Sequence, residues 1–315
     1  MRKRILKYID YGQDGNEKFL RCYVPQKLYK YRSLNEYTLE SLKESYVYAS
    51  SPLDFNDIFD CRDNIDYRDI EINKNKVLSE VSHLSSEKYK KYLVAKTIHG
   101  FEYITNICRI ACFSETNKSN LMWSHYSENH TGICIEYDYN TKNETIINHI
   151  FPVKYSKKPI NTMELKNPDV NNYNYECELD ILISAITKSK EWEYEKEWRF
   201  IIASTIFDKD REGAKFLTPI PNSILLGSRF FDILNYINDS DKLLNRLNLT
   251  ISLMEFVLKN NIKLEILLPK IGTYTLYEES LDSERIYEIL KGDNEHINII
   301  TLSEYIDKLK LKSYK

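Results

Sequence analysis

Glycine is scarce in this chain, and its scarcity limits the folds that the sequence can adopt. The 315 residues include only 8 glycines, at positions 12, 15, 100, 132, 213, 227, 272 and 292. Neither GxGxxG nor GxxxxGKS/T can be written from these positions. A Rossmann dinucleotide fold and a P-loop fold both need glycines where the backbone meets phosphate, so both are disfavoured. A nucleotide bound by this chain would have to be held by side chains.

Composition and charge narrow the class of protein further. Hydrophobic residues make up 42% and charged residues 29%, which is ordinary for a globular chain with a sizeable core. No apolar run approaches the ~20 residues of a membrane span, and the basic N-terminus lacks a secretory pattern, so we expect a cytoplasmic protein. The net charge of -3 gives no electrostatic case for broad nucleic-acid binding. The six scattered cysteines form no CxxC pair and fit reduced thiols.

Strand and helix signals intermix without regular βαβ spacing, which favours an α+β fold with a mixed or antiparallel sheet and flanking helices. β-branched and aromatic runs predict strands at 28–32, 46–50, 107–114, 133–137, 224–227 and 262–268. Helices are predicted at 35–45, 74–99, 120–130, 176–189, 240–258, 282–291 and 302–313, the third capped by Ser119 and closed by Gly132. Residues 140–175 are predicted to be dominated by loops. We expect a lead-in at 1–24, a single α+β domain at 25–280 and a C-terminal helical extension at 281–315.

The ten residues Glu191 to Phe200 read EWEYEKEWRF and alternate in character. In a β-strand, the period of two would place the glutamates and Arg199 on one face and mainly aromatic residues on the other. Carboxylates about 7 Å apart along one face repel each other, so they need water, a cation or a function. Glu195 and Glu197 could perform acid/base catalysis or stabilise a developing sugar cation. An exposed edge strand that charge keeps from aggregating is the alternative.

Two groups near the N-terminus have both functional and structural interpretations. Arg32, in the sequence LYKYR, could clamp a phosphate or carboxylate with two hydrogen bonds, or could form a surface ion pair. Asp54, Asp57 and Asp60 lie in the loop after Pro52 and could hold Mg²⁺ or Ca²⁺. A turn in which these side chains bond their own backbone accounts for the same residues.

The sequence MWSHYSENHTG at 122–132 combines aromatic residues and histidines. Trp123 and His125 could stack on a base or another ring. A helix whose aromatic residues serve only the core is an equal alternative. His125 and His130 are five residues apart, which does not suit a zinc site, and no metal is expected here.

Five motifs, taken in order, resemble a widespread bacterial domain family of unknown function. They are LYKYR at 28–32, SSPLDFNDIFD at 50–60, CFS at 112–114, MWSHYSENHTG at 122–132 and YEKEWRFI at 194–201. The resemblance runs from about Leu28 to Tyr277. Ile58 stands where the family more often has proline in FNDPFD, which is expected to alter only the turn.

The order of elements is also similar to that of NAD-dependent ADP-ribosyltransferases of the Arg–Ser–Glu type, whose fold binds NAD without a glycine-rich loop. This resemblance implies that Arg32 holds the NAD pyrophosphate and that Ser50, or its neighbour Ser51, orients the nicotinamide ribose. It implies that Glu197 stabilises an oxocarbenium-like transition state. Glu195 would then position or deprotonate the acceptor.

The same resemblance implies the remaining parts of the reaction. Tyr31 or Trp123 would stack on nicotinamide, NAD would be the substrate, and the acceptor would be a protein, a nucleic acid or a small molecule. Transfer to water would make the enzyme an NAD glycohydrolase, and such domains often serve as bacterial toxins or phage-defence effectors. Two alternatives stay open: a non-catalytic module that binds a nucleotide or a protein partner, and a metal-dependent nuclease built on Asp54, Asp57, Asp60 and Glu197.

Overall fold

The computed structural model describes residues 24–61, 65–66, 108–139, 149–161, 182–203, 213–292 and 295–312. The chain divides into two compact units, each assembled from three separate stretches of sequence. The first unit draws on 1–24, 48–112 and 144–214, and the second on 25–47, 113–143 and 215–315. The predicted helix at 74–99 and almost all of the predicted lead-in at 1–24 lie outside the described residues.

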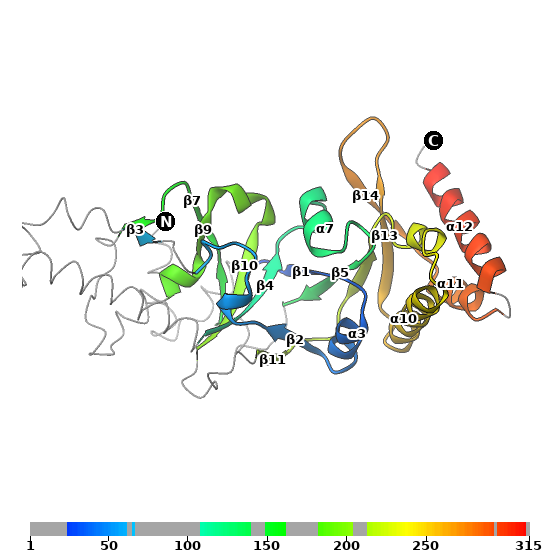
Figure 1. The fold of residues 1–315 in the computed structure, drawn as a ribbon, viewed down its shortest axis with the longest axis horizontal. Coiled ribbons are helices and arrows are strands. Elements are labelled where there is room, and N and C mark those ends of the chain that lie inside the picture. The colour runs from blue at the N-terminus through cyan, green and yellow to red at the C-terminus, as the bar shows by residue number, and fades with distance from the viewer. Residues whose placement is uncertain are drawn as a thin grey trace, which may run out of the picture. The chain divides into compact units, whose positions relative to one another are not determined.

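The second unit is built on a mixed sheet whose strands follow the order β14-β13-β12-β5-β1. These strands are β1 (Lys27–Arg32), β5 (Ile133–Asp138), β12 (Ser223–Leu226), β13 (Lys263–Pro269) and β14 (Leu276–Ser280). Figure 1 labels β14, β13, β5 and β1 of this sheet. β12 and β13 run parallel, and the other neighbours in this order are antiparallel. At the end of β4 (Cys108–Ser114), Ser114 lies opposite Tyr29 of β1. A mixed sheet accompanied by helices confirms the predicted α+β class.

Six helices accompany this sheet among the described residues of the second unit. They are α3 (Glu36–Lys43), α7 (Asn120–Tyr126), the 3₁₀ helix η4 (Asp232–Asn235), α10 (Ser240–Lys259), α11 (Ser283–Leu290) and α12 (Glu295–Lys312). The predicted caps are confirmed, because the Asn35 side chain accepts the Thr38 N–H and the Ser119 hydroxyl accepts the Met122 N–H. α10 contacts α3 and α11, and α11 contacts α12.

α7 is shorter than the sequence predicts. It ends at Tyr126, and the next residues do not continue the helix to Gly132. Glu128, Asn129 and His130 all adopt the left-handed backbone conformation, with φ of 54°, 54° and 69°. The prediction of a helix through 130 closed by Gly132 is therefore wrong, and a tight turn joins α7 to β5.

The first unit contains shorter elements. β4, β10 (Glu197–Ala203) and β6 (Ile150–Pro152) are neighbours in that order, and Phe151 of β6 lies opposite Arg199 of β10. The structure also describes two parallel pairs in this unit, β7 (Lys154–Ser156) with β9 (Thr187–Ser189) and β3 (Ile65–Asp66) with β8 (Ile160–Asn161). β2 (Tyr46–Ala49) pairs with β11 (Ala214–Leu217), and the unit boundary passes through both strands. Among its described residues, the helical parts of the first unit are η1 (Pro52–Asp54), η3 (Lys190–Glu195) and residues 182–186.

In the stretch 140–175, where loops are predicted to dominate, the structure describes only residues 149–161, and these include the short strands β6, β7 and β8. Two predictions for this unit need correction. The predicted helix at 176–189 is wrong at its end, where residues 187–189 form β9. The predicted strand at 191–200 is wrong at its start, because η3 occupies residues up to Glu195 and β10 begins only at Glu197.

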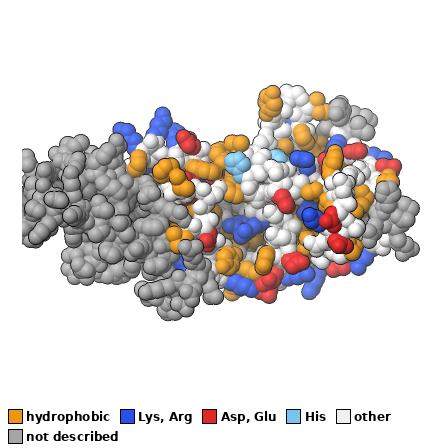
Figure 2. All heavy atoms as spheres, viewed as in Figure 1, with side chains coloured by type: hydrophobic (Ala, Val, Ile, Leu, Met, Phe, Trp, Pro, Cys, Tyr) orange, Lys and Arg blue, Asp and Glu red, His pale blue; other side chains and the backbone are white. Residues whose placement is uncertain are grey.

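Charged side chains of both signs are spread over the face drawn in Figure 2, and neither sign dominates the part that the structure describes. This distribution agrees with the small net charge of -3. No helix in the described ranges is long and apolar enough to cross a membrane.

Candidate functional site

The two glutamates singled out by the sequence lie on either side of a sharp turn. Glu195 ends η3 and Glu197 begins β10, and Lys196 between them has a left-handed backbone with φ of 44°. Glu195 is 3% exposed and Glu197 is 5% exposed. The Glu197 N–H donates to the Tyr155 hydroxyl at 2.7 Å, and its carbonyl accepts the Val153 N–H at 2.9 Å. The turn therefore buries two neighbouring carboxylates instead of displaying them along an exposed strand.

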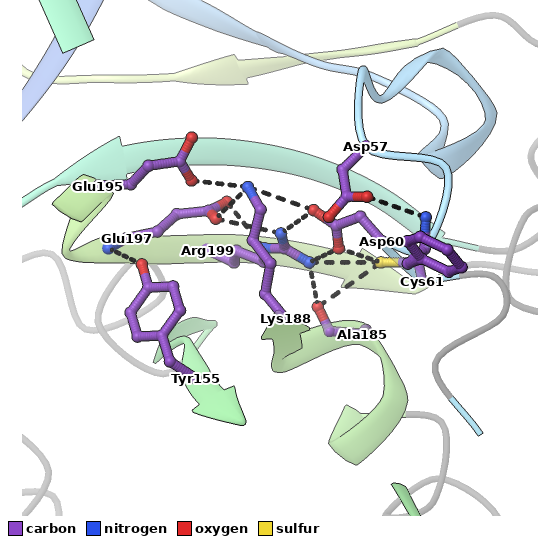
Figure 3. A network of polar contacts seen from close by, with 10 residues as sticks. Asp57, Asp60, Cys61, Tyr155, Ala185, Lys188, Glu195, Glu197 and Arg199 are labelled. Carbon is purple, nitrogen blue, oxygen red and sulfur yellow. Dashed lines mark hydrogen bonds and ion pairs between the residues drawn. The ribbon is translucent and has the colours of Figure 1, made fainter. Parts of the chain in front are cut away.

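Lys188, on β9, is a buried cation that contacts both carboxylates (Figure 3). Its ammonium nitrogen lies 2.6 Å from Glu195 Oε2 and 3.1 Å from Glu197 Oε2. It is also 3.4 Å from Asp60 Oδ2, and it lies 4.8 Å from the centre of the Trp192 ring. One buried ammonium thus contacts three carboxylates, two from the 195–197 turn and one from the loop that ends at Asp60.

Arg199, two residues after Glu197 on β10, is the second cation. Its Nε donates to Glu197 Oε1 at 2.8 Å. Its two terminal nitrogens form a bidentate pair with Asp60, at 2.7 Å and 2.5 Å, and Nη1 also donates to the Ala185 carbonyl at 2.6 Å. The side chain is fully buried, and its guanidinium lies 5.3 Å from the Phe55 ring. Because the Arg199 guanidinium is bonded along both of its edges, it fixes the positions of the Glu197 and Asp60 carboxylates.

We call these five side chains the carboxylate network: Asp60, Lys188, Glu195, Glu197 and Arg199. Burial alone disfavours the charged form of Glu197, but Arg199 and Lys188 outweigh it and hold the pKa of that carboxyl well below its usual range. Burial likewise opposes the charge of Lys188, and Glu197 foremost keeps its pKa above the usual value. Three carboxylates against two cations leave the network with a net charge of -1.

The three aspartates of the 52–60 loop differ in burial and in their contacts. Asp60 is part of the network, Asp54 is exposed, and Asp57 is buried with its Oδ1 accepting the Phe59 N–H at 3.0 Å. That last bond is the turn interaction that the sequence offered as an alternative to a metal site. Within the ranges that the structure describes, no group of three or more His, Cys, Asp or Glu side chains is arranged to hold a metal ion.

The serines assigned by resemblance also lie in the first unit. Ser50 exchanges two backbone hydrogen bonds with Ile110, at 3.0 Å and 2.9 Å. Ser51 is buried, and its hydroxyl caps η1 by accepting the Leu53 N–H at 3.3 Å. Ser50, Ser51 and both glutamates are therefore parts of one unit.

The other assigned residues lie in the second unit. Tyr31 and Trp123 are buried and meet edge to face, with ring centres 5.2 Å apart. Tyr31 donates to the Thr116 carbonyl at 2.8 Å, and Trp123 donates to the Asn117 carbonyl at 2.6 Å. These contacts match the alternative in which the aromatic helix serves the core.

Arg32 and His125 are more accessible than these two rings. Arg32 is half-buried at the end of β1, opposite Ile133 of β5. His125 is exposed near the end of α7 and lies beside Tyr126, with ring centres 6.2 Å apart.

Sequence reasoning found part of the network and missed the rest. The alternation Glu-x-Glu-x-Arg correctly indicated that Glu197 and Arg199 share one side of a strand. Lys188 gave no signal, because it lies among polar residues in a stretch that was predicted to be helical. Asp60 was noted as a possible metal ligand, but its pairing with Arg199 spans 139 residues, which no local pattern reveals.

The fold and the network define an α+β protein with a buried, ion-paired carboxylate cluster in one of its two units. A family model described as "Protein of unknown function (DUF2971)" matches residues 122–200. The match includes the MWSHYSENHTG motif and most of YEKEWRFI, and so supports the resemblance to a family of unknown function over that range. No curated protein and no solved structure matches the chain.

Proposed function

We propose that this chain is an NAD-dependent ADP-ribosyltransferase-like enzyme in which Glu197 carries the chemistry. The observation behind the proposal is a buried carboxylate that two cations keep ionised. A fixed negative charge acts most strongly on a developing cation where water is excluded. The order of the Arg32, Ser50 and Glu195–Glu197 motifs gives the proposal its second support.

The proposed reaction breaks the bond between C1′ of the ribose and the nicotinamide nitrogen. The bonding electrons leave with neutral nicotinamide, and the ribose becomes an oxocarbenium-like cation that Glu197 stabilises. A nucleophile of the acceptor then attacks C1′ and releases its proton to Glu195. If the nucleophile is water, the products are ADP-ribose and nicotinamide.

The other residues would bind and orient the substrate. Arg32 would hold the pyrophosphate as a charge-assisted fork, and Ser50 or Ser51 would orient the nicotinamide ribose. Since Tyr31 and Trp123 are buried, their part in this proposal is to fix the strand that carries Arg32. A toxin or phage-defence effector in the bacterial cytoplasm is the biological setting that the family resemblance suggests.

Incubating the protein with NAD and following free nicotinamide tests the proposal. We expect the wild type to release nicotinamide, and Glu197→Gln to lose at least about 100-fold in rate, the range for removing one transition-state contact. Glu193→Gln is the matched control, because Glu193 is exposed on η3 and pairs only loosely with Lys190, at 3.6 Å. The control should keep the wild-type rate. Equal rates for Glu197→Gln and the wild type would refute the role of Glu197.

A non-catalytic binding module is the second candidate, and one observation favours it. All three carboxylates of the network are already ion-paired, as in a cluster that only stabilises the fold. Such a module would bind NAD or ADP-ribose in a calorimeter and release no nicotinamide, even with candidate acceptors present. The enzyme proposal requires release, so one pair of measurements separates the two candidates.

A further inference from the structure

Helix α10 carries one charged residue, Arg246, on its otherwise uncharged buried face. The residues that α10 buries are Arg246, Leu247, Thr250, Leu253, Met254, Phe256 and Val257. Arg246 is only 7% exposed. An arginine on the core side of a helix is rare unless it has a partner, because burying its charge is costly.

The contacts of Arg246 leave much of its guanidinium unused. Nη2 donates to the Thr131 carbonyl at 2.5 Å, and the guanidinium lies 4.6 Å from the centre of the Phe230 ring. Nε is buried and has no hydrogen-bond partner. A guanidinium has five N–H donors and no acceptor, so only an acceptor can complete this set of contacts.

The charge of Arg246 is also uncompensated. No ion pair between described residues includes it, and the nearest acidic influence is Glu128, whose side chain is exposed. Burial lowers the pKa of Arg246 to about 10, which still leaves the group protonated at neutral pH. Arg229 adds positive charge nearby: its N–H donates to the His130 carbonyl at 3.0 Å, and after burial it is the next cause of the lowered pKa of His130.

We propose that Arg246 anchors a binding site for a small oxyanion of the phosphate type, where α10 meets the 127–132 turn. The unpartnered Nε and the adjacent Nη2 form the side of the guanidinium that binds tetrahedral oxyanions with two parallel hydrogen bonds. The exposed Arg229 contributes to the positive field that draws an anion to this place. The site lies within the second unit and does not depend on ADP-ribosyl transfer.

Thermal unfolding with inorganic phosphate, against chloride at the same ionic strength, tests the site. We expect saturating phosphate to raise the melting temperature of the wild type by at least about 3 °C, because a ligand that binds only the folded state stabilises it. Arg246→Met should lose this increment. Arg246→Lys keeps the charge but lacks the fork, and should bind phosphate about tenfold more weakly or worse by calorimetry.

Lys242→Met is the matched control, since Lys242 is an exposed cation on the same helix, four residues before Arg246. It should keep the full phosphate increment. A wild type that responds equally to phosphate and chloride would overturn the proposal, as would an Arg246→Met variant that keeps the wild-type response. If Arg246 serves only to bind the Thr131 carbonyl, the wild type will respond equally to phosphate and chloride. Arg246→Met will then also melt at a lower temperature than the wild type in chloride. Acetate in place of phosphate shows whether a carboxylate suffices.

Discussion

At the scale of single residues, the carboxylate network depends on Lys188, whose role is visible in the structure but not in the sequence. Lys188 is the one group of the network that contacts all three carboxylates. Arg199 reaches Asp60 and Glu197, so Glu195 relies on Lys188 within the network. Removing one member of a buried ion pair costs far more than the pair contributes, because the charge left behind is desolvated and unpaired.

Replacing Lys188 with methionine should therefore lower the free energy of unfolding by about 3–5 kcal/mol. Denaturant titration measures this loss. Lys190→Met is the control, since Lys190 forms an exposed pair with Glu193 and should cost less than about 1 kcal/mol. Adding Glu195→Gln to Lys188→Met should recover part of the loss, because it removes one of the buried negative charges that Lys188 offsets. Equal losses for Lys188→Met and Lys190→Met would mean that the network contributes no special stability.

The shifted pKa values also predict how stability depends on pH. The pKa of folded Glu197 lies below its ordinary value of 4.5, so its contribution is fully present above pH 4.5 and is lost as the pH falls toward the folded value. The pKa of folded Lys188 lies above its ordinary 10.5, so its contribution is present below pH 10.5 and is lost as the pH rises beyond it. Denaturation midpoints measured across pH should fall at both ends. Glu197→Gln should flatten the acid side, and an unchanged acid side would contradict the assignment.

At the scale of elements, capping residues and hydrophobic patterns correctly predicted the helices and strands that depend on local sequence. Capping by Asn35 and Ser119 marked the starts of α3 and α7, and hydrophobic patterns located β1, β5, α10 and β13. The stretch 190–195 forms a 3₁₀ helix where a strand was predicted, because alternating glutamates and aromatic residues are compatible with both structures. At its end Glu195 accepts a hydrogen bond from Lys188, a contact that the alternating pattern does not indicate. The sequence therefore indicated Glu195 and Glu197 as candidate site residues, but it did not predict the turn that lies between them.

The turn between α7 and β5 gives a prediction at this scale. A methyl group on Gly132 would collide with the Arg32 carbonyl oxygen and lie 2.9 Å from the Ser127 carbonyl oxygen. Because both atoms belong to the backbone, Gly132→Ala should cost about 3 kcal/mol, measured by denaturant titration. Gly272→Ala is the comparison: Gly272 has φ of 72° and no atom within 4 Å of the added carbon, so only its backbone conformation resists alanine. That variant should cost about 1 kcal/mol, and the reverse ranking would show that the turn can yield.

At the scale of the whole molecule, the sequence indicated the α+β class but not how the chain is shared between units. The chain crosses between the units near residues 24, 47, 112, 143 and 214, and no local sequence signal marks the last four of these crossings. The predicted division into 1–24, 25–280 and 281–315 stays a prediction. The assigned residues follow the crossings: Ser50, Ser51, Glu195 and Glu197 fall in the first unit, and Arg32, Tyr31, Trp123 and His125 in the second.

The interleaving of the two units has a consequence for how such a protein can be inherited. The matched segment 122–200 begins in the second unit and ends in the first. A gene fragment that encoded only this segment would carry β5 without β1 or β12, its neighbours in the sheet, and Glu197 without Asp60. Recombination could not transplant either unit as one continuous cassette. We therefore expect the chain to pass between genomes as an undivided gene.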